Sequence, residues 1–474
     1  MPDRDHIKVL FNPLLVFILT ISFIYFSGKS ISEGNIRIPF SIFLFLFSAA
    51  IATSIRFGVF YLFFYIVFMA FLKRVLFAVQ GFTFFEPAYL VTDVVTIVMF
   101  LVVINRYREK ILAAYKKSFA FKVLLFLQII FFVQIFNPLQ GSLMIGLTGS
   151  KFLLIPSLLA YVAFGVDRRA LKILFTTLTW LALVSSLYAI YQFHKGFFDF
   201  EILWAKKSGM HSLFLGDRIR PFSFFPSPNE FSLFIATVAL IEIAMSSLSP
   251  GILFTLIRLF IYALASFYVN VRAGPFIFLF LFPLLIIFKI SRRALPTLFL
   301  YYFVLLILIN FISGTSLRDL NLKIVGVNPV YVEHFLQGII DPAARGSSFI
   351  HRLKLWRNAF INVLKNPFGH GIGVSTLAAR RFGGYALHVE STFVSMLYSC
   401  GIFGFLSLMF LVFYVSIKGF LKLVTYRHDK IMLALWIGFV SIFMGQWLVT
   451  YFQGAFFWLS MGVLLRWIDL KEEI

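Results

Sequence analysis

The residue types best suited to chemistry gather within residues 348–405 of this apolar chain. Arg352 and Trp356 lie one helical turn apart there, and His388 and Glu390 come directly before a long apolar run. Charged groups are costly to bury in a membrane, and those found there usually line a wet, functional cavity. We therefore expect this segment to contribute to an active site.

Glu390 is the candidate for acid–base chemistry, because it is a carboxylate at the entrance of an apolar helix with several arginines near it in sequence. Two interpretations stay open: a structural ion pair with those arginines, or a general base in a transfer reaction. Burial and the neighbouring cations would set the pKa of Glu390. In the second interpretation His388 orients or assists Glu390, while Ser391 serves as a helix cap.

The candidates for binding an anion are Arg220, Arg272 and Arg352. Arg220 lies shortly before a helix that we expect Asn229 to cap, and a cation is unfavourable at a helix N-terminus. Arg272, between two apolar runs, either reaches the lipid headgroups or points into a cavity beside Arg220. Arg352 shares a helix face with Trp356, which is itself a common interfacial anchor.

The composition places these residues in a membrane protein. Of 474 residues, 61% are hydrophobic and 13% are charged, whereas about 25% are charged in ordinary soluble proteins. Apolar runs of about 20 residues, each long enough to cross a bilayer as a helix, recur from end to end. We expect an all-α polytopic membrane protein in which residues 1–474 form one integral membrane domain. The first apolar run lacks a small-residue cleavage site, so we interpret it as a retained span.

The apolar runs predict about fourteen transmembrane helices. We place them at residues 11–27, 38–54, 57–72, 87–104, 119–136, 152–166, 171–192, 228–247, 252–269, 274–290, 294–313, 390–417, 431–449 and 453–467. Counted from a cytoplasmic N-terminus, the inside hairpins are rich in lysine and arginine, as the positive-inside rule requires. These hairpins are residues 106–117, 168–172, 289–293 and 418–430. Both termini are then cytoplasmic, and residues 193–227, 270–274 and 314–389 face outward.

The long outer loop, residues 314–389, is strongly basic. It holds nine lysines and arginines against three acidic residues, and this excess indicates an anionic partner on that face. Nucleic acid is not expected in that compartment. A lipid-linked phosphate or pyrophosphate is the natural candidate, because arginine offers a bidentate fork to phosphoryl oxygens.

We expect this loop to be structured. Apolar residues recur at helical spacing over residues 351–364, which predicts a helix lying on the membrane surface. Asn366 and Pro367 should end it, and the glycines at 369, 371 and 373 then allow a tight backbone path. No strand precedes these glycines, so they do not predict a nucleotide-binding loop.

Other polar residues are given simpler roles. The histidines at 351, 370 and 388 lack the spacing of a metal site, so none is predicted. Asp93, within an apolar run, is either a proton-relay residue or a hydrogen-bond partner of Thr92 and Thr96. We favour the hydrogen bonds.

In their order, these motifs resemble the pattern of the O-antigen polymerase and ligase superfamily, the Wzy-type membrane glycosyltransferases. Arg220 precedes Pro228-Asn229, and Arg272 opens the sequence RAGPF. Arg352-Leu-Lys-Leu-Trp356 leads into NPFGHGIG, and His388 precedes Gly401-Ile402-Phe403-Gly404. The resemblance covers about residues 137–410, including NPLQGSLMIGLTGSKFLLI.

The resemblance implies a C-type glycosyltransferase fold in the bacterial inner membrane, with the active site facing the periplasm. It implies undecaprenyl-pyrophosphate-linked oligosaccharides as donor and acceptor, contact with membrane lipids, and a chain-length regulator protein as a further partner. No metal or nucleotide cofactor is implied. Arg220, Arg272 and Arg352 would then bind the pyrophosphate, and Glu390 with His388 would be catalytic.

One departure from the pattern bears on the reaction. Ligases of this superfamily typically read His-x-His-Asn, whereas this chain reads His388-Val389-Glu390-Ser391. A Glu-Ser pair is more similar to the polymerases, so we favour polymerisation of repeat units. The alternatives are an O-antigen ligase that transfers polysaccharide to lipid A-core, and a flippase for lipid-linked oligosaccharides. A flippase should have pseudo-repeated halves, and we find none in the sequence.

Overall fold

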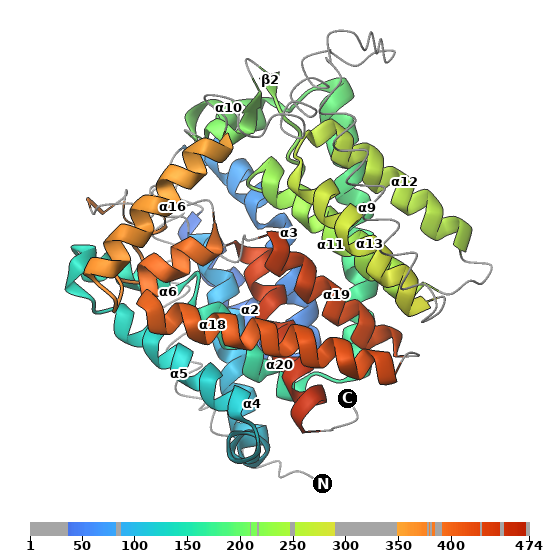
Figure 1. Ribbon diagram of the computed structural model, residues 1–474. Helices are drawn as coiled ribbons and strands as arrows, with labels where there is room; N and C mark the ends of the chain where they lie inside the picture. The colour runs from blue at the N-terminus through green and yellow to red at the C-terminus, as the bar shows by residue number, and fades with distance from the viewer. Residues whose placement is uncertain are drawn as a thin grey trace.

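The computed structural model describes residues 37–81, 87–208, 210–215, 218–246, 252–289, 348–376, 379, 382–383, 391–426, 429–445 and 450–470. These residues are almost entirely helical (Figure 1). The long helices are α2 Arg37–Ala52, α3 Ile55–Gln80, α4 Val91–Lys117, α5 Phe119–Gln134, α9 Arg168–Lys195, α11 Pro228–Met245, α12 Ile252–Val269, α13 Ala273–Lys289, α16 Ser348–Lys365, α18 Thr392–Thr425, α19 Lys430–Gly445 and α20 Tyr451–Asp469. Shorter helices are α6 Leu143–Ser150, α7 Leu154–Ser157, α8 Leu159–Val162, α10 Asp199–Lys207, η2 Pro87–Leu90, η3 Pro138–Gln140, η4 Ala163–Gly165 and η5 His211–Leu213. Strands β1 Phe214–Leu215 and β2 Arg218–Ile219 form an antiparallel hairpin.

The described residues confirm the predicted all-α membrane class. Predicted spans 11–27 and 294–313 lie outside the described residues, and the other predicted spans fall on helices. Within the described part of the chain, 6 stretches are long and apolar enough to cross a membrane: Ile55–Val79, Ala88–Lys117, Leu143–Gly165, Arg168–Lys195, Pro228–Met245 and Thr392–Thr425. Shorter apolar helices accompany them. The total of about fourteen spans stays a prediction.

The span predicted at 152–166 is wrong as one continuous helix. The chain passes there through α7, α8 and η4, after the separate helix α6. Pro156 lies inside α7, and its missing N–H removes a donor from the helical ladder. The apolar stretch Leu143–Gly165 is long enough to cross the membrane only as this chain of short pieces.

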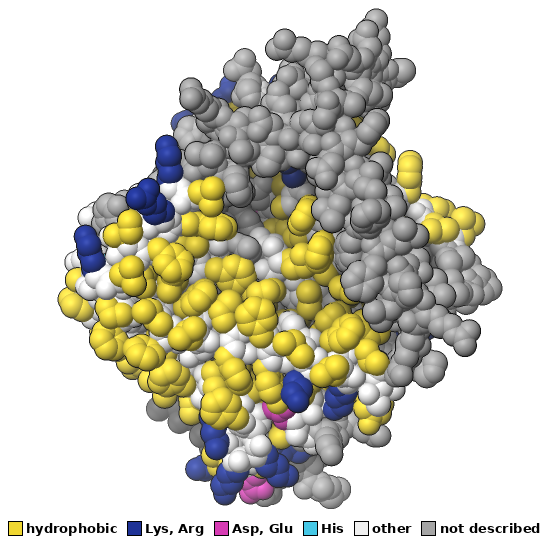
Figure 2. Space-filling view, viewed as in Figure 1, with side chains coloured by type: hydrophobic (Ala, Val, Ile, Leu, Met, Phe, Trp, Pro, Cys, Tyr) yellow, Lys and Arg dark blue, Asp and Glu magenta, His cyan; other side chains and the backbone are white. Residues whose placement is uncertain are grey.

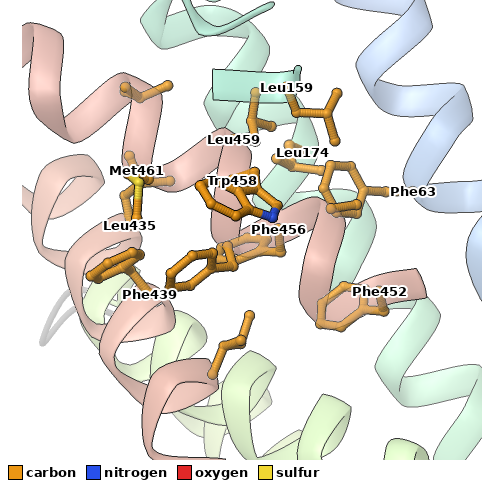
Figure 3. Packing of buried hydrophobic residues seen from close by; sticks show 14 of the residues in the cluster. Phe63, Leu159, Leu174, Leu435, Phe439, Phe452, Phe456, Trp458, Leu459 and Met461 are labelled. Carbon is orange, nitrogen blue, oxygen red and sulfur yellow. The ribbon is translucent and has the colours of Figure 1, made fainter. Parts of the chain in front are cut away.

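Helix α20 is the centre of the packing. Nearly every residue along it is buried, as expected for a helix that is apolar on all sides. Trp458 is fully enclosed, and Figure 3 shows it beside Leu159 of α8 and Leu174 of α9. Phe452 meets Phe234 of α11 edge-on, with ring centroids 4.7 Å apart. These contacts fix α20 inside a ring of other helices.

The outer surface carries a broad apolar belt. Figure 2 shows hydrophobic side chains over most of the described part of one face, with lysines and arginines gathered at its lower end and at its upper left. Large side chains on several helices are more than half exposed, among them Leu101, Trp180 and Phe260. Soluble proteins rarely expose contiguous apolar patches beyond a few hundred Å². We therefore assign the belt to lipid contact.

The described parts of the predicted inside hairpins 168–172 and 418–430 meet at one end of the helices. Arg168, at the start of α9, forms a 2.6 Å ion pair with Asp429, directly before α19. The hydroxyl of Ser118, between α4 and α5, donates to Asp469 at the end of α20. Figure 1 shows α10 and β2 at the opposite end. Among the described residues, the inner hairpins and the outer segment at α10 and β2 are thus at opposite ends, while the choice of which end is cytoplasmic stays a prediction.

Candidate functional site

Arg220 links the β-hairpin to the corner between α12 and α13. Its Nε and Nη2 both donate to the carbonyl oxygen of Phe214 at 3.3 Å, and its Nη1 donates to the carbonyl oxygen of Asn270 at 3.4 Å. Its backbone N–H donates to Leu213 at 2.8 Å. This side chain is therefore held half-buried, against Asn270, which lies two positions before Arg272 in the facing corner.

The corner that carries Arg272 is fixed against α11. Asn270 adopts a positive φ of 54° and turns the chain out of α12, and the carbonyl oxygen of Arg272 accepts the N–H of Phe276 at the start of α13. Gly274 lies so close to α11 that a Cβ there would stand 2.3 Å from the Ser232 hydroxyl oxygen. This close approach requires glycine. Because Arg220 lies shortly before α11 and Arg272 shortly before Gly274, the approach also brings the segments that bear the two arginines together.

The N-cap of helix α11 lies two residues earlier than predicted. The N-cap is Ser227, whose hydroxyl oxygen accepts the N–H of Glu230 at 3.3 Å, and Pro228 takes the first helical position. The predicted cap at Asn229 is therefore wrong. Proline favours the first turn because its fixed φ suits a helix and its missing N–H needs no partner there.

A buried polar network lies behind Arg220, and its residues were not predicted. Arg74 of α3 and Glu201 of α10 form an ion pair at 3.8 Å, with side chains 1% and 0% exposed. Gln192 of α9 donates to Glu201 at 2.9 Å. The sequence does contain a signal for Arg74, because this arginine interrupts an apolar run in which a charge is costly. Its partners, in contrast, are far away in the chain.

Burial sets the ionisation of Glu201, which lies outside the membrane-spanning segments. Removal of this carboxyl from water raises its pKa above the ordinary value, and the nearby Arg74 and the hydrogen bond from Gln192 oppose that rise. The N–H of Phe198 also donates to its carboxylate at 3.4 Å. Every oxygen of Glu201 therefore has a donor.

Helix α16 packs through one stripe onto the start of α18. Ala359 and Val363 are buried there against Val374 and Leu397. Trp356 packs on the same cluster, and position 352 falls on the same stripe, four residues before it. The predicted surface helix over residues 351–364 is confirmed as a helix, and it ends at Lys365, as Asn366 and Pro367 predicted.

The glycine-rich turn after α16 inserts into a break in α18. The N–H groups of His370 and Gly371 donate to the carbonyl oxygens of Tyr398 and Ser399 at 3.0 and 3.1 Å. In return, the N–H of Ile402 donates to Pro367 at 2.9 Å. Gly401, with φ 70° and ψ −170°, makes the break. These glycines therefore have a backbone role, in agreement with the predicted tight path.

The segment at residues 134–149 supports the same turn from the other side. The side-chain amides of Gln134 and Asn137 donate to the carbonyl oxygens of Phe368 and Gly369 at 2.6 and 3.0 Å. A Cβ on Gly149 would lie 2.5 Å from the Cα of Gly373. The motif NPLQGSLMIGLTG and the motif NPFGHGIG are therefore packed against each other.

His388 and Glu390 lie outside the described residues, as do Arg380 and Arg381. Helix α18 begins at Thr392, so Ser391 occupies the predicted N-cap position, although its side chain makes no capping hydrogen bond. Arg352 lies in the described backbone of α16. The structure thus brings Arg220 to the Arg272 corner and joins α16 to the start of α18.

Asp93 has a partner that was not predicted. Thr92 donates to it at 3.5 Å, in line with the prediction, and Lys151 forms an ion pair with it at 3.3 Å. Lys151 also donates to the carbonyl oxygen of Tyr89 at 2.7 Å. The pair borders a small pocket that Thr96 and Tyr451 also line. A structural ion pair accounts for these contacts.

Residues 257–409 match the family model described as O-antigen ligase. The matched region runs from α12 past the break at Gly401, so it includes Arg272, Arg352, His388 and Glu390, while Arg220 precedes it. No curated protein matches the chain.

Proposed function

Because residues 257–409 match a family model described as O-antigen ligase, we propose that this membrane enzyme polymerises undecaprenyl-pyrophosphate-linked oligosaccharide repeat units. Donor and acceptor are both lipid-linked, and the sugar transfer takes place at the periplasmic face of the bacterial inner membrane. The family supports a function of the polymerase or ligase type in general. Within that general function, we propose the polymerase rather than the ligase.

The contact between Arg220 and Asn270 carries the proposal. It holds one arginine against the corner that bears a second, at the end of the helices opposite the basic hairpins. Arginine remains charged at any physiological pH and presents a planar fork that matches phosphoryl oxygens. Two arginines on adjoining segments are suited to bind a pyrophosphate leaving group, and in our proposal Arg352 on α16 is the third.

The chemistry follows from these roles. A hydroxyl of the acceptor sugar attacks the anomeric carbon of the donor, and the bond from that carbon to the pyrophosphate oxygen breaks. Glu390 accepts the hydroxyl proton, His388 orients Glu390, and undecaprenyl pyrophosphate leaves with the bonding electrons. Arg220, Arg272 and Arg352 stabilise the charge that develops on the leaving group.

The identity of residue 390 favours the polymerase, because related ligases carry a histidine where this chain carries Glu390. The ligase is the second candidate, since the matched model is described as a ligase. Purified protein incubated with a lipid-linked repeat unit decides between them. A ladder of product lengths supports the polymerase. A single transfer to added lipid A-core supports the ligase, and translocation across vesicles with no transfer refutes both.

A further inference from the structure

The segment between Arg220 and α11 is a buried turn without regular structure. Phe222 and Ser223 are completely buried, and Ser223 has a positive φ of 52°. Buried backbone groups need hydrogen-bond partners, and irregular backbone inside a membrane protein is tolerated only where they exist. The side chains that satisfy this turn therefore determine where Arg220 is held.

Arg74 satisfies the carbonyl groups of the turn. Its Nη2 donates to the carbonyl oxygen of Ser223 at 2.6 Å, and its Nη1 donates to that of Phe225 at 3.3 Å. Its guanidinium also lies over the ring of Phe222, 4.6 Å from the centroid. One planar side chain thus binds two carbonyl groups and covers one ring, which a lysine cannot do.

Gln192 satisfies the N–H groups of the same turn. Its Oε1 accepts from Phe222 at 3.1 Å and from Ser223 at 2.8 Å. Its Nε2 donates to Glu201, which pairs with Arg74. Arg74 of α3, Gln192 of α9 and Glu201 of α10 therefore form one connected network. Arg74 binds the carbonyl groups of the turn, Gln192 binds its N–H groups, and Glu201 contacts both side chains.

We propose that Arg74 and Gln192 are positioning residues for Arg220, acting through the buried turn at residues 221–227. The inference rests on the proposed function, in which Arg220 binds the pyrophosphate. Arg74 lies too deep to meet a substrate, since its side chain is 1% exposed. In this proposal its effect on binding passes through Arg220, whereas a residue that only stabilises the fold would leave the affinity for the probe unchanged.

The test is a double-mutant cycle with farnesyl pyrophosphate as the binding probe, on the full chain in lipid nanodiscs. Arg74→Lys keeps the charge and loses the two-carbonyl contact, so we expect the probe to bind roughly 10- to 100-fold more weakly. Arg220→Ala should weaken binding by at least as much. The double variant should bind no more than about twofold more weakly than Arg220→Ala alone, because coupled residues are not additive.

Arg466 provides the matched control. It is a buried arginine of α20 that also donates to two backbone carbonyl groups, those of Ala163 and Val166, at the opposite end of the helices. Arg466→Lys should lower the melting temperature in the same way as Arg74→Lys and leave the probe affinity unchanged. An affinity loss in Arg466→Lys equal to that in Arg74→Lys would mean a general structural effect and would overturn the inference.

The remaining outcomes are also decisive. If the affinity losses of Arg74→Lys and Arg220→Ala multiply in the double variant, the two residues act independently and the positioning role is overturned. Unchanged probe affinity in Arg74→Lys overturns it as well. Normal affinity in Arg220→Ala refutes the proposed pyrophosphate site instead, so the two failures are distinguishable. If Arg74→Lys does not fold, Gln192→Met replaces it in the cycle, because it removes the acceptor for two N–H groups at nearly constant volume.

Discussion

The backbone N–H of His370 donates to the carbonyl oxygen of Tyr398 at 3.0 Å, and their rings stack with centroids 4.2 Å apart. In an unbroken helix this carbonyl would accept from Ile402, which donates instead to Pro367. The glycine-rich turn therefore replaces part of the helical ladder of α18. Two motifs that are separate in the sequence form one structural unit, which directs the first turns of α18 away from the rest of that helix.

Gly401→Ala should destabilise the protein strongly. Its φ of 70° and ψ of −170° belong to a region that is essentially glycine-only, at a cost of roughly 1–3 kcal/mol for other residues. A Cβ there would also lie 2.2 Å from the carbonyl oxygen of Pro367. Gly196→Ala is the control, since Gly196 has φ 88° and ψ −171° with open space around it. Thermal unfolding in detergent should give a clearly larger loss for Gly401→Ala, and equal losses would contradict the packing role.

The stability of the protein should fall as the pH drops below about 6.5, in part through His370. Partial burial lowers the pKa of His370 from its ordinary value of 6.5. Below pH 6.5 the unfolded chain therefore binds a proton that the folded chain does not yet bind, and folding loses stability until the pH passes the folded pKa. His370→Phe keeps the stacking on Tyr398 and cannot titrate. Its melting temperature should depend less on pH between 5 and 7 than that of the unaltered protein, and an identical pH profile would exclude His370 as the cause.

Local patterns predicted the helices and some of their ends. The apolar runs gave the spans, and helical spacing of apolar residues gave α16 together with its end before Asn366. These features depend on neighbouring residues alone. The cap of α11 was misplaced because Asn229 and Ser227 are both good caps, and Pro228 decides between them.

Contacts between distant segments could not be predicted. Arg74 and Ser223 are 149 residues apart in the chain, and no local pattern joins them. The break at Gly401 is also invisible locally, because an apolar run with two glycines predicts one continuous helix. Only the inserted turn of residues 367–371 shows why that helix ends and restarts.

Lys354 should be accessible from the outside of the cell if α16 faces the periplasm. It is exposed on α16, whereas Lys116 is exposed at the opposite end of the helices. In a Cys400→Ala background, Lys354→Cys should react with an impermeant maleimide added to intact cells. Lys116→Cys should react only after permeabilisation. The reverse labelling pattern would invert the topology and move the candidate site to the cytoplasm.

Alanine at Arg220, Arg272 or Arg352 should reduce glycosyl transfer while the protein stays folded. Loss of one partner of a desolvated charge pair typically costs roughly 2–5 kcal/mol, and we expect losses of this size in kcat/KM. Lysine should rescue each position only in part, because it lacks the bidentate fork. Arg357→Ala, on the exposed face of α16, is the control and should retain activity. Full activity in all three variants would remove the arginines from the site.

Glu390→Gln should abolish elongation while substrate binding persists. The amide keeps the size and hydrogen bonding of the carboxylate and removes its basicity, and general-base catalysis contributes about 10² to 10⁴ in rate. We expect kcat for ladder formation to fall by that factor, with little change in the Kd for the lipid-linked repeat unit. His388→Ala should lose less, because in our mechanism it only orients Glu390. If Glu390→Gln elongates normally and His388→Ala is inactive, the histidine is the base and the ligase-like mechanism becomes the better explanation.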